Sequence, residues 1–323
     1  MKPKLSVICL AYNQQDYIRQ ALDGFVMQKT NFPFEVIVHD DASTDKTADI
    51  IREYQKRYPD IIKPIFQTEN QFSRGSNIMT KFIWPNVRGK YVAMCDGDDY
   101  WTDGNKLQKQ VDFLDTHPDY TICFHPVQVF WDDNKEPEYI YPKNLKHVSL
   151  ENLMRVNFIP NCSVVYRWCN IGDQWPLDIY PWDWYVHLWH AKNGKIGFIP
   201  SAMARYRRQP GGISFAYTNG MDALHMHHGI KEMNFFIQVE KNIAPNPVQY
   251  HKFVCERATE IFGAYARNKK FDLATQVMQM CPDLIQNHKK INEEARRWHH
   301  RFNKLLIFGG AIIALLVILI IKG

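Results

Sequence analysis

The sequence lacks the features that mark several common classes of protein. Its seven cysteines are scattered and contain no C-x-x-C pair, which argues against a disulfide framework and against a zinc site. The net charge of +5 is small and no compact basic motif is present, so we expect no nucleic-acid partner. No G-x-G-x-x-G or Walker-type loop follows an apolar run, so the usual phosphate-binding loops are absent.

A secretory signal is also missing from the first residues. The stretch MKPKLSVICLAYN has a short apolar run before polar residues resume, and this pattern predicts a first strand instead of a signal peptide. Unpaired cysteines are typical of proteins in reducing compartments. Both observations favour a cytosolic location for this part of the chain.

The composition is that of a folded protein, with 46% hydrophobic and 14% aromatic residues. In the first half, fully apolar runs alternate with segments of helical spacing. Strands of this kind are buried on both faces, so the pattern predicts an α/β fold with a mostly parallel central sheet flanked by helices. The expected strands are 5–10, 34–40, 61–66, 90–95 and 195–207, and the expected helices are 17–26, 43–58, 75–84, 105–117, 149–155 and 182–194. The pattern is less regular from residue 121 onward, with further apolar stretches at 121–131 and 161–167.

Residues 222–300 show helical patterns throughout and no strand pattern. We therefore expect three parts: a catalytic domain over 1–215, a helical extension over 216–304 and a transmembrane helix over 305–321.

The segment LLIFGGAIIALLVILII, residues 305–321, carries no charge and is apolar on every helical face. At about 1.5 Å per residue it would extend roughly 26 Å, enough for a thin bilayer. Basic residues are richer before it than after it, which predicts a single-pass C-terminal anchor in the cell inner membrane with the catalytic domain in the cytoplasm. Gly310 and Ala314 form a small-x-x-x-small pair that would support a homo-oligomer.

Two expected strands end in acidic residues. Asp40 and Asp41 follow the strand at 34–40, and Asp96, Asp98 and Asp99 follow the strand at 90–95. In an open parallel sheet, ligands bind beyond the carboxyl ends of the strands. Carboxylates at such an edge suit Mg²⁺ or Mn²⁺, which bridge them to phosphate oxygens.

Several segments together resemble a known family. LSVICLAYNQQDYIRQAL, EVIVHDDASTDKT, GKYVAMCDGDDYW and WDWYVHLWHAKNGKIGFIPSAMARYRRQPGGIS occur in this order. They are similar to the signature segments of bacterial-type family 2 glycosyltransferases, inverting enzymes of the GT-A fold that use nucleotide-diphospho-sugars. The resemblance covers about residues 4–215.

The resemblance implies a role for each matching residue. Asp183 takes the position of the catalytic base. Asp98 is expected to be a metal ligand, with Asp96 and Asp99 beside it. The residues expected to bind the nucleotide or its diphosphate are Ala11, Tyr12, Asn13, Asp40, Asp41, Arg74, Asp96, Arg207 and Gln209. Gln209 stands where the family more often has histidine.

The resulting hypothesis is a membrane-attached hexosyltransferase that moves a sugar from a UDP- or GDP-sugar to a glycan or lipid-linked acceptor, with inversion, in cell-surface polysaccharide synthesis. One alternative is a sugar nucleotidyltransferase, although the segment CLAYNQQDY lacks the glycine-rich, basic loop that such enzymes need. The other is a catalytically degenerate membrane scaffold, against which the intact acidic residues argue.

Overall fold

The structure is a computed structural model, which describes residues 2–132, 137–143, 145, 148–172, 175–176, 178–209 and 220–284. The chain divides into two compact units, the first comprising residues 1–177 and 183–210, and the second residues 178–182 and 211–323. The domain boundary expected near residue 215 lies outside the described residues.

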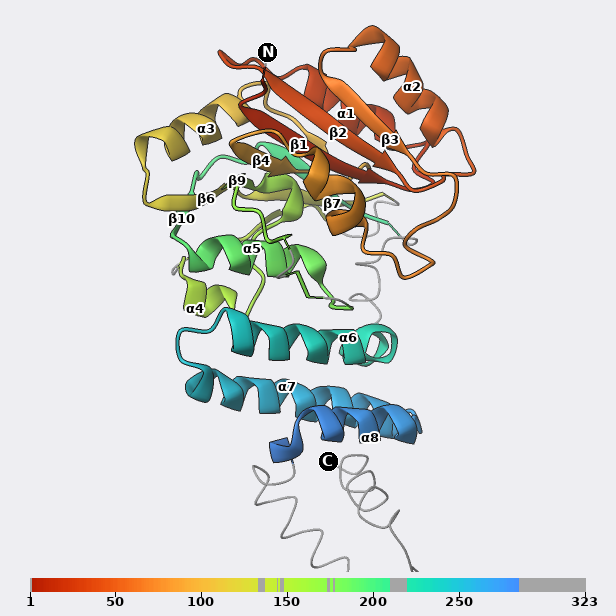
Figure 1. The fold of residues 1–323 in the computed structure, drawn as a ribbon, viewed down its shortest axis with the longest axis vertical. Helices are drawn as coiled ribbons and strands as arrows, with labels where there is room; N and C mark the ends of the chain where they lie inside the picture. Colours follow the sequence, from red (N-terminus) through yellow and green to blue (C-terminus); the bar gives the residue numbers. More distant parts are fainter. Residues whose placement is uncertain are drawn as a thin grey trace, which may run out of the picture. The chain divides into compact units, whose positions relative to one another are not determined.

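In the described part of the first unit, seven strands form the larger sheet: β1 (Leu5–Ala11), β2 (Phe34–Asp40), β3 (Ile62–Phe66), β4 (Tyr91–Met94), β6 (Tyr120–Phe124), β9 (Val165–Arg167) and β10 (Lys195–Phe198). Their order across the sheet is β10-β6-β9-β4-β1-β2-β3 (Figure 1). Strand β9 is antiparallel to β4 and β6, whereas the other neighbours are parallel. The expected α/β architecture is therefore confirmed, with a mixed sheet.

A second sheet was not expected from the sequence. It contains, within the described residues, β5 (Tyr100–Trp101), β7 (Val127–Trp131), β8 (Tyr139–Tyr141) and β11 (Ala204–Arg208), in the order β5-β11-β7-β8. The prediction of one strand over 195–207 is wrong, because β10 and β11 belong to different sheets. Pro200 offers no N–H to a ladder, and the Ser201 N–H donates to the Ile199 carbonyl at 2.8 Å, which turns the chain between the two strands.

The helical segments of the first 210 residues are α1 (Ile18–Val26), α2 (Thr47–Arg57), α3 (Lys106–Thr116), α4 (Leu150–Leu153), α5 (Trp182–Lys192), and the short turns η1 (Met79–Ile83), η2 (Trp84–Asn86) and η3 (Asn161–Ser163). The α-helix predicted over 75–84 is replaced by the π-helix η1 and the 3₁₀ turn η2. Pro85 explains this difference, since it lacks the N–H that an α-helix would need.

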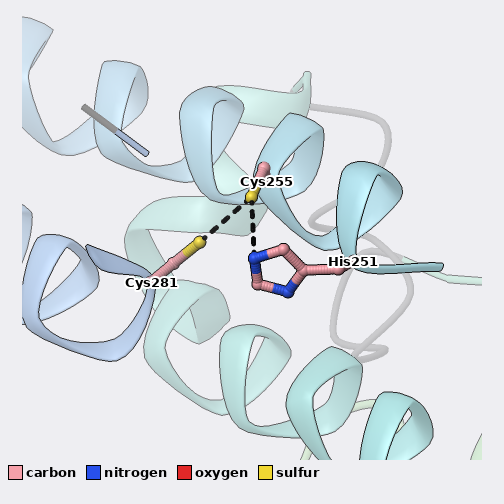
Figure 2. A group of neighbouring side chains, drawn as sticks. All are labelled: His251, Cys255 and Cys281. Atoms are coloured by element: carbon pink, nitrogen blue, oxygen red, sulfur yellow. Dashed lines mark hydrogen bonds between the residues drawn. The ribbon is translucent and has the colours of Figure 1, made fainter. Parts of the chain in front are cut away.

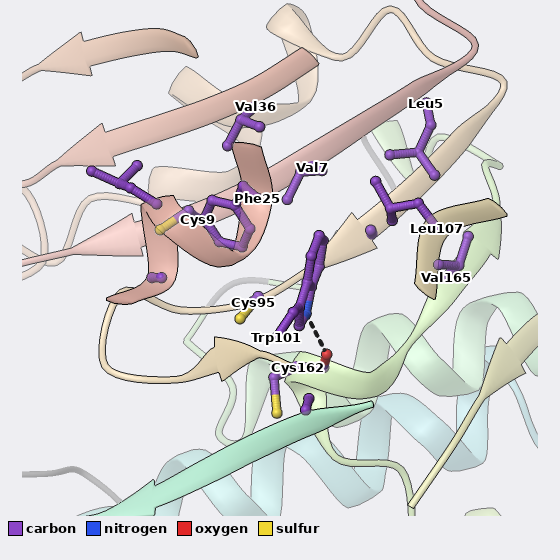
Figure 3. Close-up of a cluster of buried hydrophobic side chains, with 14 of the residues drawn as sticks. Leu5, Val7, Cys9, Phe25, Val36, Cys95, Trp101, Leu107, Cys162 and Val165 are labelled. Atoms are coloured by element: carbon purple, nitrogen blue, oxygen red, sulfur yellow. Dashed lines mark hydrogen bonds between the residues drawn. The ribbon is translucent and has the colours of Figure 1, made fainter. Parts of the chain in front are cut away.

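One face of the larger sheet packs against three helices. Alternate residues of β1, among them Leu5, Val7 and Cys9, are fully buried and point to this face. The same apolar cluster contains Phe25 of α1 and Leu107 of α3 (Figure 3). Burial of this kind is the main source of stability in such a layer. It fixes β1, and with it the edge of the sheet where the acidic residues gather.

The second unit is helical in its described part, with α6 (Met221–Asn242), α7 (Pro247–Arg267), α8 (Phe271–Met280) and the turn η6 (Pro282–Leu284). The prediction of helices beyond residue 222 is confirmed as far as Leu284. Gly229 lets α6 approach α7 closely, since a Cβ there would lie 2.7 Å from atoms of Ile261 and Tyr265. The Tyr265 hydroxyl accepts from the Ile230 N–H at 3.1 Å.

Among the described helices, none combines the length and the apolar character needed to cross a bilayer. The predicted membrane span at 305–321, with its pair Gly310 and Ala314, lies outside the described residues.

A buried lysine lies inside the core of the first unit. Lys106 is fully buried, and its Nζ donates to Gln110 Oε1 at 2.8 Å and lies 4.2 Å from the centre of the Trp101 ring. Gln110 Nε2 in turn donates to the carbonyls of Cys123 (2.8 Å) and Ser163 (2.9 Å). Burial lowers the pKa of Lys106 from its ordinary 10.5 to about 8. The folded state therefore loses this proton at a lower pH than the unfolded chain does.

This difference predicts how stability changes with pH. Between pH 8 and 10.5 the unfolded chain keeps the Lys106 proton that the folded state has released, so the contribution of this group to stability rises with pH. At neutral pH the buried ammonium costs up to about 3 kcal/mol. We therefore expect Lys106→Met to be more stable than the wild type near pH 7. The difference between their free energies of unfolding, measured by urea unfolding, should shrink by about 2–3 kcal/mol as pH rises from about 7 to 10.

The matched control is Lys109→Met on the same helix, whose side chain is 46% exposed and pairs with Asp103. Its difference from the wild type should change little across this range. If the free energies of unfolding of the wild type and Lys106→Met changed with pH in the same way, the lowered pKa of Lys106 would be wrong.

Candidate active site

The loops that follow β1 and β2 are joined by hydrogen bonds. Asn13 has a φ of 50°, in the left-handed region that asparagine adopts more easily than most residues. Its N–H donates to Ser43 Oγ at 2.9 Å, and its Oδ1 accepts from the Thr44 N–H at 2.8 Å. The carbonyl of Ala11, the last residue of β1, accepts from the Asp41 N–H at 3.0 Å. These contacts place the end of β1 beside the acidic end of β2.

The two acids at the end of β2 have different surroundings, although both are buried. Asp40 Oδ2 accepts from the Ser43 N–H at 3.2 Å, whereas its Oδ1 has no hydrogen-bond partner in the described residues. Asp41 uses both oxygens on the next loop, accepting from the N–H groups of Gln71 (2.8 Å) and Phe72 (3.0 Å). A buried oxygen without a partner is costly, so Asp40 Oδ1 is a candidate for a ligand contact, while Asp41 organises the loop.

Residues 96–99, here named the acid turn, follow β4 and pack against the end of β1. The Gly97 N–H donates to the Leu10 carbonyl at 2.9 Å. A Cβ at Gly97 would lie 2.4 Å from Gln14 Oε1 and 2.8 Å from Ile18 Cδ1. A larger residue at position 97 would therefore require the ends of these two side chains to move.

The carboxylates of the acid turn carry raised pKa values. Burial raises the pKa of Asp96 to about 7, with added repulsion from Asp98 and from Asp183. Burial also raises the pKa of Asp98, and raises that of Asp99 well above its ordinary value, with repulsion from Asp98 adding to the second. The repulsion shows that these acids share one small region.

A buried arginine holds the acid turn in place. The backbone N–H of Arg207 donates to Asp99 Oδ1 at 2.8 Å, and its Nε donates to the Asp98 carbonyl at 2.9 Å. The rest of the guanidinium bonds to Asp132 and Gln20. Arg207 was expected to close over a diphosphate. The structure instead shows its guanidinium engaged with the protein and its side chain 6% exposed.

Two amides contact the acid turn from opposite directions. Gln209 Nε2 donates to Asp98 Oδ2 at 2.9 Å, so this departure from the family's histidine still supplies a donor. Asn161 Nδ2, from η3, donates to Asp96 Oδ2 at 3.0 Å. Asn161 and Asp132 were not predicted, because no local sequence pattern distinguishes them from ordinary loop residues.

Asp183 lies in the first turn of α5. Burial raises its pKa to about 6, although the Trp184 backbone N–H opposes this shift. Its negative charge raises the pKa of Asp96. The structure therefore brings Asp183 into the electrostatic neighbourhood of the acid turn, from a segment more than eighty residues away in the sequence.

Three of the predicted residues, Tyr12, Asn13 and Arg74, are exposed. Tyr12 is 46% exposed at the end of β1. The side chain of Arg74 is 60% exposed, and its Nη1 pairs with Glu69 Oε2 at 2.6 Å. The contact of Arg74 with a nucleotide stays a prediction.

The acid turn suits a hard divalent cation. Asp96 and Asp98 are half-buried and offer oxygen ligands, and a cation between them would stabilise the charged carboxylates that burial disfavours. Asp99 is 3% exposed and already bound to the Arg207 backbone, so it fits a supporting position. Oxygen donors of this kind match Mg²⁺ or Mn²⁺.

Comparison with known proteins gives relatives that match part of this chain. An uncharacterised protein of Mycobacterium tuberculosis is 46% identical over 217 residues, which cover 67% of this chain and 62% of that protein. A putative teichuronic acid biosynthesis glycosyltransferase of Bacillus subtilis is 35% identical over 113 residues, or 35% of this chain and 42% of that protein. The chain thus matches less than two thirds of the length of these relatives.

Solved structures share the fold at low sequence identity. Staphylococcus aureus TarS 1–349 in complex with UDP-GlcNAc has a TM-score of 0.53 at 18% identity, covering 91% of this chain and 92% of that one. A Pyrobaculum calidifontis mannosyltransferase in complex with GDP-mannose and Mn²⁺ has a TM-score of 0.54 at 14% identity, covering 100% of this chain and 86% of that one. Both likenesses support a GT-A-like fold.

The family profile described as glycosyl transferase family 2 matches residues 6–210. The matched region contains both acidic strand ends, Asp183 and Arg207, and it corresponds to the first unit. The chain therefore belongs to glycosyl transferase family 2.

Proposed function

We propose that this protein transfers a sugar from a UDP- or GDP-sugar to a glycan or lipid-linked acceptor, with inversion at the anomeric carbon, in cell-surface polysaccharide synthesis. The observation that carries the proposal is the convergence of Asp96, Asp98 and Asp183: burial raises the pKa of Asp96 to about 7, and repulsion from Asp98 and from Asp183 adds to this shift. The teichuronic acid relative and the nucleotide-sugar complexes of the structural neighbours support the same substrate classes.

The donor side of the site would use the ends of β1, β2 and β4. Residues Ala11, Tyr12 and Asn13 would line the nucleotide, and the unpartnered Asp40 Oδ1 would accept a hydrogen bond from the base. Mg²⁺ or Mn²⁺ would be held by Asp98 and Asp96 and, when bound, would offset charge on the departing diphosphate.

The remaining contacts keep these carboxylates in place. Asn161 orients Asp96, and Gln209 orients Asp98 through the bonds already described. Arg207 fixes the acid turn from the side of the second sheet. Preorganised groups of this kind lower the barrier because they need no rearrangement during the reaction.

Asp183 would take the proton from the attacking acceptor hydroxyl. Its pKa of about 6 lies near neutral pH, where a carboxylate can act as an efficient general base. A single base opposite the leaving group gives one displacement and therefore inversion. The match of residues 6–210 to the family favours this transfer over nucleotidyl transfer.

A first experiment screens UDP- and GDP-sugars for metal-dependent hydrolysis and for thermal stabilisation of the purified chain. The proposal expects one nucleotide class to stabilise the protein in the presence of Mg²⁺ or Mn²⁺. If no nucleotide sugar were bound or hydrolysed, the degenerate scaffold would be the better description.

We further propose that the chain is attached to the cell inner membrane through residues 305–321, with the catalytic domain in the cytoplasm. The support is the uncharged apolar segment and the basic residues Arg296, Arg297, Arg301 and Lys304 before it. A cytoplasmic domain would also meet nucleotide sugars where they are made.

The metal assignment predicts that Asp98→Ala abolishes transfer and metal-dependent nucleotide binding. The fold should survive, because Asp98 is half-buried and its burial, which raises the pKa of the carboxyl group, already disfavours the charge that the substitution removes. Binding is measured by calorimetry with and without Mn²⁺. The control Asp60→Ala changes an exposed acid and should leave both properties unchanged. Wild-type activity of Asp98→Ala in EDTA would refute the metal role.

The base assignment predicts that Asp183→Asn lowers kcat by about 100-fold or more, with donor binding little changed. The control is Asp60→Asn, which changes an exposed acid and should leave kcat unchanged. Steady-state kinetics and donor calorimetry separate the two effects. An unchanged kcat for Asp183→Asn would assign the base to another acid, with Asp178 first in line.

The membrane assignment predicts that deletion of residues 305–323 moves the protein from the membrane fraction to the soluble fraction. The truncated chain should still hydrolyse the donor but transfer poorly to a membrane-embedded acceptor. Fractionation after a carbonate wash measures the first property. Retention of the truncated chain in the washed membranes would place the attachment elsewhere in the protein.

A further inference from the structure

The second unit contains a group of soft ligand atoms far from the acid turn in sequence. His251 and Cys255 are four residues apart on α7, so they lie on one face of the helix. Cys281 directly follows α8. Figure 2 shows the three side chains pointing toward one another, and their ligand atoms all lie within 4.8 Å of one another.

The separations match the edges of a metal tetrahedron. Cys255 Sγ lies 3.5 Å from Cys281 Sγ and 3.5 Å from His251 Nε2. Tetrahedral zinc, with bonds of about 2.3 Å to sulfur and 2.0–2.1 Å to nitrogen, places two sulfurs about 3.8 Å apart and a sulfur and a nitrogen about 3.6 Å apart. Small shifts of the side chains would therefore make room for the ion.

The surroundings of His251 also favour a cation. Its Nδ1 lies 2.9 Å from Glu240 Oε1, and its Nε2 lies 3.1 Å from Asp283 Oδ2. A neutral imidazole that donates from Nδ1 to Glu240 presents a lone pair at Nε2, which faces the carboxylate of Asp283. A metal ion bound at Nε2 would attract the Asp283 carboxylate, as a proton at Nε2 also would.

We propose that the second unit binds one Zn²⁺ ion through His251 Nε2, Cys255 Sγ and Cys281 Sγ, with Asp283 as the fourth ligand. The side chain of Asp283 is 50% exposed and has room to turn toward the ion. Thiolate and imidazole ligands select zinc over the hard cations suited to the acid turn. Binding releases the two thiol protons, since sulfur coordinates as the thiolate.

The proposed site has the features of a structural zinc centre. Both cysteines are buried, at 4% and 2% exposure, while His251 is 33% exposed and gives the ion a way in. Glu240 of α6 would hold His251 in the correct orientation, as carboxylates that accept a hydrogen bond from a metal-binding histidine commonly do. The ion would join α7 to the turn after α8, and through Glu240 it would tie both to the end of α6.

This proposal departs from the expectation, drawn from the sequence, that a zinc site is absent. That expectation rested on the lack of a C-x-x-C pair, whereas here the two cysteines are 26 residues apart. They meet because α7 and α8 pack side by side in the second unit.

The test uses the untagged full chain, purified in detergent and stripped of metal with a chelator. Zn²⁺ should bind with one ion per chain, and Co²⁺ should give the absorption of a tetrahedral thiolate complex. Cys255→Ser and Cys281→Ser should each lose the cobalt spectrum. Glu240→Gln should raise the Zn²⁺ dissociation constant by about 10- to 100-fold, because a neutral amide accepts from His251 Nδ1 more weakly than the carboxylate does and leaves the ligands themselves unchanged.

The matched control is Cys169→Ser, which changes an exposed cysteine of the first unit and should bind Zn²⁺ as the wild type does. Asp98→Ala should also keep the cobalt spectrum, which separates this site from the acid turn. Where a cysteine variant fails to fold by circular dichroism, Glu240→Gln provides the test alone.

Three results would overturn the proposal. One is a wild-type chain that shows no thiolate spectrum with Co²⁺. Another is a Cys255–Cys281 disulfide, found by mass spectrometry in protein purified under reducing conditions. The third is wild-type Zn²⁺ affinity in His251→Gln, which would mean that His251 is not a ligand.

Discussion

Burial of several carboxylates in one small region is the constraint on which the acid turn depends. Burial raises the pKa of Asp96, and repulsion from Asp98 and Asp183 adds to the shift, so a chain free to move would separate these acids. The fold prevents this separation. The Gly97 N–H donates to the Leu10 carbonyl near the end of β1, and Arg207 secures the acid turn through both its backbone and its guanidinium. A fold that holds like charges together is prepared for a cation.

Buried core residues also help to hold the acid turn in place. Asn161, which donates to Asp96, belongs to η3. Trp101 and Gln110 hold η3 in place by donating hydrogen bonds to its carbonyl groups. Trp101 Nε1 donates to the Cys162 carbonyl at 2.8 Å, as Figure 3 shows. The buried Lys106 bonds to Gln110 and so belongs to the same network. Core residues that never touch a substrate can therefore act on the site by positioning Asn161.

The two metal sites that we propose differ in chemistry, and the difference makes them separable. The acid turn offers only oxygen ligands, which suit Mg²⁺ or Mn²⁺ during turnover. The second unit offers two sulfurs and an imidazole, which suit a permanently bound Zn²⁺. Each ion would be poorly matched to the other site. A single chain can thus use one metal for reaction and another for stability.

The sequence by itself determined the features that depend on neighbouring residues. Apolar runs such as the one in β1 predicted buried strands, and acids directly after β2 and β4 predicted a polar edge, because strand ends and turns are encoded locally. The tertiary structure alone decided which distant residues meet. Asp132 and Gln20 reach Arg207 only because β11 lies beside β7 and near α1. His251, Cys255 and Cys281 form a group only because two helices pack together. These contacts depend on how the helices and strands pack together, which no short stretch of sequence specifies.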